Sequence, residues 1–119
     1  MTGNTATQHG GAVSLDTVGS SGNATVEARE STLWANSASL DGGAIHLSDP
    51  RTSVLLTNST ISGNVAGRNG GAAFVGAPAL LATSHATITD NRAATSGGGI
   101  HVDAGAAVEI GRASCRERV

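Results

Sequence analysis

Large aromatic side chains are almost absent from this sequence. Trp34 and Phe74 are its only tryptophan and phenylalanine, tyrosine is missing, and aromatic residues make up 2% of the chain. A chain of 119 residues is long enough for one modest domain. Because the apolar residues are mainly small or aliphatic, we expect a thin core of Val, Ile, Leu and Ala rather than a globular core of large side chains.

Charge and sulfur are also scarce. Charged residues make up 13% of the chain, its formal net charge is −2, and it has no lysine. Such a chain lacks a basic patch that could hold phosphates, so nucleic acid is a poor candidate partner. The single cysteine, Cys115, excludes a disulfide within the chain. Apolar runs stay well short of the roughly 20 residues of a membrane-spanning helix, so we expect no membrane span in this fragment.

The C-terminal segment IGRASCRERV (110 to 119) differs from everything before it, since it holds three of the seven basic residues and the cysteine. Written back as codons, it can be read as a common short-read sequencing adapter translated in frame, which would also supply part of the Glu109 codon. We therefore expect residues 109–119 to be an artefact outside the fold. Residues 1–108 are then a partial domain truncated at both ends. A genuine basic tail is the alternative.

The sequence does contain a repeat with fixed internal spacing. Asparagine recurs with periods of 32, 28 and 27 residues, and a glycine pair begins six residues after each copy. The asparagines are Asn4, Asn36, Asn64 and Asn91, and the glycine pairs are Gly10 and Gly11, Gly42 and Gly43, Gly70 and Gly71, and Gly97 and Gly98. Four matches at one spacing indicate a repeat architecture.

The segments after the glycine pairs alternate with period two, as β-strands do. One face is apolar, and the residues between face the other way: Ser14, His46, Phe74 and His101. Thr, Val, Ser, Gly and Asn dominate the other segments, which argues against helical repeats. Strands joined by tight corners once per period form a coil, so we predict an all-β parallel β-helix fragment of about four coils. Each coil should give one strand to each of about three sheets.

The asparagines and glycines are expected to act structurally. Glycine accepts φ > 0 at a sharp corner, and asparagine tolerates that region better than other non-glycine residues. If each asparagine also points inward, its amide can bond the asparagines of both neighbouring coils in a ladder. Asn36 and Asn64 would then be interior, and Asn4 and Asn91 would be the ends. The alternative is that asparagine is present only for its backbone preference.

The repeat resembles the right-handed parallel β-helix repeats of polymorphic outer membrane proteins and related autotransporter-like surface proteins, whose hallmarks are GGA[ILV] and FxxN. The first hallmark is matched by GGAV (10 to 13) and GGAI (42 to 45). The second is approached, with an aliphatic residue in place of Phe, by LWAN (33 to 36), ISGN (61 to 64), ITDN (88 to 91) and MTGN (1 to 4).

This resemblance implies a right-handed coil and an extracellular, cell-surface or outer-membrane location. It implies a non-catalytic scaffold, part of an adhesin-like or autotransporter passenger protein. The partners it implies are a host-cell surface, a protein or polysaccharide ligand, and further coils of the same chain stacked on these.

We expect no metal, cofactor or catalytic site. His46 and His101 share a register but are two coils apart, which places them about 10 Å from each other and too far apart to share a zinc ion. Both should lie on an exposed strand face. The row Ser14, His46, Phe74 and His101 is the binding face that we would test first.

Other polar residues have plain structural explanations. His9 and Asp41 precede glycine pairs on neighbouring coils, where a His-Asp pair is conceivable, although we expect a solvated corner. Glu30, Asn58 and His85 share a register, and a polar outer row explains all three.

Two other functions remain alternatives. Polysaccharide lyases and glycoside hydrolases also use right-handed β-helices, but they need several carboxylates converging on one face. Here only Asp16 and Asp49 are expected to approach one another. An ice-binding solenoid is the third reading, since Thr32, Thr60 and Thr87 share one register. Stacked β-branched residues already favour a sheet, so we prefer a structural role for them.

Overall fold

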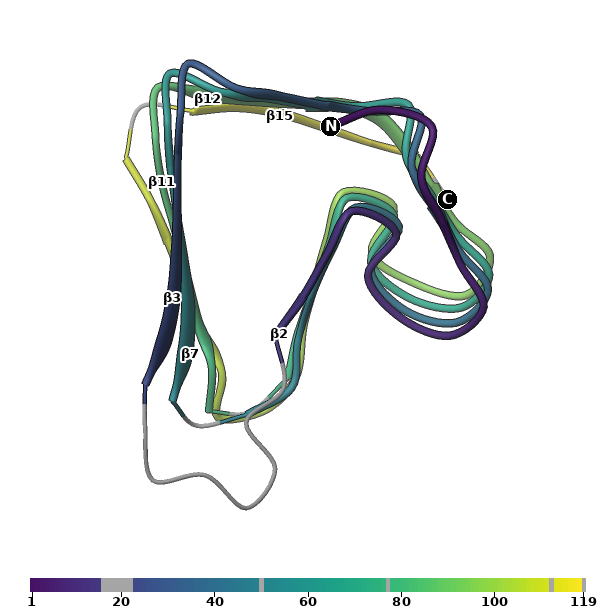
Figure 1. The fold of residues 1–119 in the computed structure, drawn as a ribbon, viewed down its shortest axis with the longest axis horizontal. Helices are drawn as coiled ribbons and strands as arrows, with labels where there is room; N and C mark the ends of the chain where they lie inside the picture. The colour runs from purple at the N-terminus through teal and green to yellow at the C-terminus, as the bar shows by residue number, and fades with distance from the viewer. Residues whose placement is uncertain (16–22, 50, 77, 112, 119) are drawn as a thin grey trace.

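The chain folds as an all-β parallel solenoid (Figure 1). The computed structural model describes residues 1–15, 23–49, 51–76, 78–111 and 113–118. Seen down the shortest axis, successive coils overlie one another and repeat the same path around three sides. The described residues include no helix long and apolar enough to cross a membrane. The prediction of an all-β parallel β-helix is confirmed.

Three parallel sheets form the sides of the solenoid. The first sheet contains β1 (Thr5–Ala6), β4 (Thr32–Trp34), β5 (Ser37–Ala38), β8 (Thr60–Ser62), β9 (Val65–Ala66), β12 (Ala86–Ala93) and β15 (Ala113–Arg118). The second contains β2 (Val13–Leu15), β6 (Ile45–Leu47), β10 (Ala73–Val75) and β13 (Ile100–Val102). The third contains β3 (Ala24–Arg29), β7 (Thr52–Thr57), β11 (Leu80–Ser84) and β14 (Ala107–Ile110).

Pairing between coils follows the register of the repeat. Phe74 on β10 pairs with His46 on β6 and with His101 on β13. His46 in turn pairs with Ser14 on β2. This register places equivalent positions of the repeat next to one another on neighbouring coils. Because side chains alternate along each strand, each sheet has one inward and one outward row.

A thin aliphatic core fills the space between the sheets. Its largest fully buried members are Ile45, Leu47, Val54, Leu56, Ile61, Val75, Leu81 and Ile88. Ala38, Ala66 and Ala93 are buried on β5, β9 and β12 of the first sheet. Burying each large aliphatic side chain stabilises the fold by roughly 1.5–3 kcal/mol.

The corners depend on residues in the left-handed region. One such position is the first glycine of each pair, for example Gly42 with φ of 69°. A second lies between the third and first sheets, at Glu30, Asn58 and His85. A third immediately precedes each ladder asparagine, at Gly3, Ala35, Gly63 and Asp90. The expectation that the repeat asparagines themselves take up the left-handed turn is therefore wrong, since their neighbours do so.

The second glycine of the first three pairs, Gly11, Gly43 and Gly71, is required by close approach of the backbone. A Cβ on Gly43 would overlap the carbonyl oxygen of Gly71 on the next coil and would lie 2.7 Å from the backbone nitrogen of Val65. Two coils therefore meet at this point with only hydrogen between them. The glycine pair combines a left-handed turn with a point of contact between coils.

The C-terminal segment is paired in the structure. β14 reaches Ile110, and β15 pairs in parallel with β12, with Ala113 opposite Ala86 and Arg118 opposite Arg92. This differs from the expectation that residues 109–119 lie outside the stack. The physical reason is that the edge of the last coil presents unpaired backbone N–H and C=O groups, which an extended chain satisfies. The adapter origin of the segment is a separate hypothesis and stays a prediction.

Candidate functional site

The four repeat asparagines form a hydrogen-bonded ladder inside the solenoid. The Nδ2 atom of Asn4 donates to Oδ1 of Asn36 (2.9 Å), Asn36 donates likewise to Asn64 (3.0 Å), and Asn64 to Asn91 (2.8 Å). Asn4 is exposed, whereas the other three are at most 1% exposed. The amides therefore link coil to coil through the interior.

Each interior amide uses its full bonding capacity. Nδ2 of Asn64 also donates to the carbonyl oxygen of Leu33 (3.0 Å), and its Oδ1 also accepts from the backbone N–H of Asn36 (2.8 Å). With the two ladder bonds, this satisfies both donors and both acceptor sites of the amide. The amides of Asn36 and Asn64 leave no polar group free for a ligand, so their role is structural.

The chemically diverse side chains lie outside, on the outer face of the second sheet. Two rows run across the coils there. The strand row consists of Ser14, His46, Phe74 and His101, and the turn row, one residue before each glycine pair, consists of His9, Asp41, Asn69 and Ser96. The corner at each first glycine folds the turn row back toward the strand row.

Four rings from the two rows stack in a column. Ring centroids lie 4.3 Å apart for His9 and His46, 5.1 Å for His46 and Phe74, and 5.3 Å for Phe74 and His101. His9 fills the ring position of its coil because Ser14 has no ring. The sequence pattern identified the strand row but missed His9, which enters the column from the turn.

The strand row is not uniformly exposed as predicted. Ser14 is exposed, Phe74 and His101 are half-buried, and His46 is only 6% exposed. The exposed-face expectation is therefore wrong for His46. The cause is that the rings of His9 and Phe74 cover both faces of its imidazole.

Asp41 is a buried carboxylate held by an ion pair. It is 1% exposed, and Arg68 on the next coil donates to it from Nε (2.9 Å, to Oδ1) and from Nη2 (to Oδ2). The backbone N–H of Asn69 also donates to Oδ1 (3.2 Å), and His9 Nδ1 lies 3.5 Å from Oδ2. The expectation of a solvated corner at Asp41 is thus wrong, because Arg68 and His9 cover the Asp41 carboxylate.

Electrostatics keep Asp41 ionised. Burial raises the pKa of its carboxyl group, but the hydrogen bond and charge of Arg68, the Asn69 N–H and the charge of His9 together outweigh burial and leave the pKa below its usual value. Arg68 was missed from the sequence. The sequence did carry a signal for this ion pair. Arg68 stands two residues before the glycine pair of its own coil, and Asp41 stands one residue before the glycine pair of the neighbouring coil.

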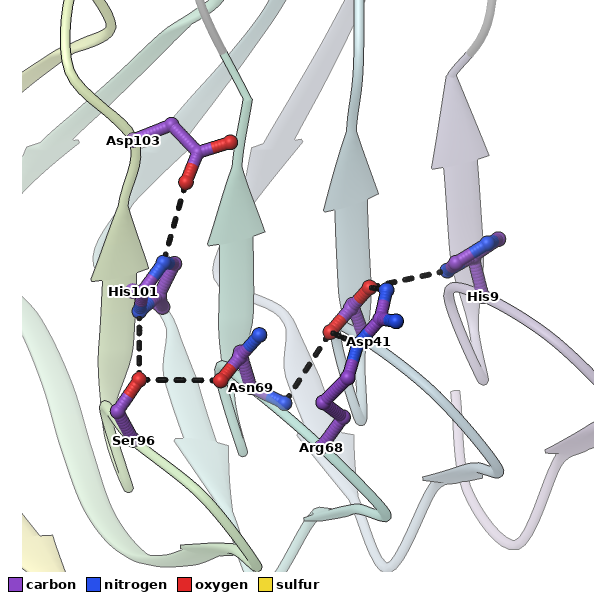
Figure 2. Close-up of polar contacts among 7 residues, drawn as sticks. All are labelled: His9, Asp41, Arg68, Asn69, Ser96, His101 and Asp103. Carbon is purple, nitrogen blue, oxygen red and sulfur yellow. Dashed lines mark hydrogen bonds and ion pairs between the residues drawn. The ribbon is translucent and has the colours of Figure 1, made fainter.

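Ser96, His101 and Asp103 have the residue types of a nucleophilic triad. Ser96 Oγ lies 2.9 Å from Nδ1 of His101, and Nε2 of His101 lies 3.2 Å from Oδ1 of Asp103. Figure 2 shows these contacts together with the bond from Ser96 to Asn69. Because the Ser96 hydroxyl donates to Oδ1 of Asn69 (3.0 Å), its proton is not directed at the imidazole. The arrangement is a polar network rather than an activated serine.

Glu27, Glu30, Asn58 and His85 lie apart from this face. Asp16, which was expected near Asp49, is outside the described residues. Glu27 pairs with Arg29 on the outer side of β3, at 3.6 Å. Glu30, Asn58 and His85 form an exposed corner row.

The threonine register predicted from the sequence is present on the first sheet. Thr60 pairs with Thr32 and with Thr87. The outward row two residues further along is irregular and consists of Trp34, Ser62 and Thr89.

Three parallel sheets, paired glycines and an interior asparagine ladder define the chain as a parallel β-solenoid built from one repeat. Residues 85–103, which include Asn91 and the pair Gly97 and Gly98, match the model of the Chlamydia polymorphic membrane protein repeat. This match and the β-solenoid fold support a β-helix repeat of the polymorphic membrane protein type. The matched family is one of outer-membrane and cell-surface proteins. Comparison with curated proteins found no match. Comparison with solved structures found none either.

Proposed function

We propose that the chain is a non-catalytic segment of an extracellular adhesin-like scaffold, of the autotransporter passenger type, that presents its second sheet to a ligand on a host-cell surface. The observation that carries this proposal is the contrast between interior and exterior. The interior is occupied by aliphatic side chains and by asparagines bonded to one another. The outer face of the second sheet carries the ring column and its polar partners.

The accessible end of this face suits recognition rather than turnover. Phe74 and His101 are half-buried, and Asp103 beside them is exposed. Aromatic edges flanked by hydrogen-bonding groups can contact either a protein or a polysaccharide. Catalysis of the lyase or hydrolase type would need converging carboxylates. Three of the described acids instead form separate pairs, Asp41 with Arg68, Glu27 with Arg29 and Asp103 with His101.

Adhesion of coated beads tests the proposal. Fluorescent beads carrying the purified chain should bind cultured animal cells, and soluble chain should compete. His101→Ala and Phe74→Ala should reduce binding, whereas His85→Ala, a matched exposed histidine on a distant corner, should not. Equal binding by all variants would assign adhesion to another face, and release of unsaturated or reducing products from polygalacturonate would contradict a non-catalytic role.

A further inference from the structure

We propose that His9, Asp41 and His46 form a binding site for one divalent first-row transition-metal cation, such as Zn²⁺, on the outer face of the second sheet. One ring nitrogen of each histidine and one carboxylate oxygen of Asp41 lie within 4.8 Å of one another. Two imidazoles and a carboxylate are a common protein ligand set for Zn²⁺ and its neighbours. Nothing in the polymorphic membrane protein repeat match, which begins at residue 85, extends to these residues.

The carboxylate is oriented for this role. Its Oδ1 accepts from Nε of Arg68 and from the N–H of Asn69, whereas Oδ2 accepts from Nη2 of Arg68 and faces Nδ1 of His9 at 3.5 Å. A carboxylate oxygen has two lone-pair directions, so Oδ2 can bind a cation on the His9 side while keeping its bond to Arg68. Arg68 then acts as an outer partner that holds the ligand in place, as hydrogen-bonded carboxylates commonly require in metal sites.

One ring must turn for both imidazoles to bind the same ion. The imidazoles of His9 and His46 stack with centroids 4.3 Å apart and a tilt of 26°, so their in-plane nitrogen lone pairs point in similar directions until the His9 ring rotates out of the stack. Bonds of about 2.0–2.1 Å to a tetrahedral zinc ion place ligand atoms about 3.3 Å apart. His46 and Asp41 are buried, whereas the His9 side chain is 30% exposed and lies on a turn. His9 is therefore the ligand that moves, and its solvent side leaves room for a water as fourth ligand.

Another histidine on the same face provides a matched comparison. His101 belongs to the same ring column and has an acid, Asp103, at 3.2 Å. Phe74 separates His101 from His46, with centroid distances of 5.3 and 5.1 Å to the two rings. The His101 pair thus offers one imidazole and one carboxylate, whereas the site at His9 offers two imidazoles and one carboxylate.

Metal titration of the tag-free, chelator-treated protein tests the site. Isothermal titration with Zn²⁺ should show one site per chain, and Co²⁺ should give visible absorption bands typical of a four-coordinate site. His9→Phe and His46→Phe keep a ring in the column, as Phe74 does naturally, but remove the ligand nitrogen. Each should weaken Zn²⁺ binding by more than about tenfold, since loss of even an outer partner commonly costs 10–100-fold.

The controls decide between this site and others. His101→Phe should leave Zn²⁺ affinity unchanged, and so should Cys115→Ser, which tests the thiolate as a competing ligand. If His46→Phe does not fold, His9→Phe on the half-exposed turn gives the decisive result. Absence of Zn²⁺ binding to the unaltered protein, full affinity in His9→Phe, or equal loss in His101→Phe would each overturn the proposal. Ca²⁺ binding as tight as Zn²⁺ binding would do so as well, because Ca²⁺ prefers oxygen ligands.

Discussion

The side-chain amide of Asn64 donates to Oδ1 of Asn91 across 2.8 Å, and both residues are 0% exposed. This contact joins two coils through the interior, where both amides are shielded from solvent. Loss of either partner should therefore be costly at the interior asparagines.

Asn64→Ala should therefore destabilise the protein clearly more than Asn4→Ala. The first substitution strips partners from Asn36, from the Leu33 carbonyl and from Asn91, at about 1–3 kcal/mol for each buried group left unsatisfied. The second removes one bond from an exposed end of the ladder. Urea melts of the two variants and the unaltered chain measure the difference. Equal losses would show that the ladder contributes little to stability.

Gly43→Ala should be more damaging than Gly3→Ala. Gly3 has φ of 64° with no atom within 4 Å of an added Cβ, so its substitution should cost only the left-handed strain, about 1–2 kcal/mol. At Gly43 the new methyl group would overlap the Gly71 carbonyl and separate two coils. We expect a loss above about 3 kcal/mol there. Thermal unfolding of both variants provides the measurement, and a Gly43→Ala protein as stable as Gly3→Ala would refute the close approach.

Acid should weaken the fold partly through Asp41. Its folded-state pKa lies below the ordinary value near 3.8. A group whose pKa is depressed by folding stabilises the protein above the unfolded pKa, and that contribution disappears as pH falls through the folded pKa. Urea midpoints measured with chelator from pH 7 down to pH 3 should fall less steeply for Asp41→Asn than for the unaltered chain. Glu27→Gln, at an exposed pair, is the control and should leave the slope unchanged.

Ice binding should be absent. Thr32, Thr60 and Thr87 provide one threonine column, but the next outward row contains Trp34, whose side chain is bulky and exposed, and Ser62. A regular, flat array of methyl and hydroxyl groups is therefore interrupted. Thermal hysteresis of a concentrated solution should equal that of a buffer containing an unrelated protein of the same concentration. Measurable hysteresis that is lost in Thr60→Val would reverse this assignment.

Several features of the fold could be predicted because they repeat. The asparagine spacing and the period-two pattern after each glycine pair place like residues on neighbouring coils, and Phe74 does pair with His46 and His101. The turn geometry was less predictable. Left-handed φ is found at Ala35 and Asp90, which are not glycines, because the corner is imposed by the coils on either side.

Sequence alone determined the parallel β-solenoid and the strand row, since a fixed period dictates which residues stack. Only the tertiary structure decided how the turn segments fold over the second sheet. It brought His9 against His46 and covered Asp41 with Arg68, because the direction of a side chain at a corner depends on the neighbouring coil and not on the repeat. The expectation of no metal site considered His46 with His101, two coils apart. The proposed site arises instead from two turn residues, His9 and Asp41, and a strand residue, His46, on adjacent coils, a proximity that the left-handed glycine corner creates.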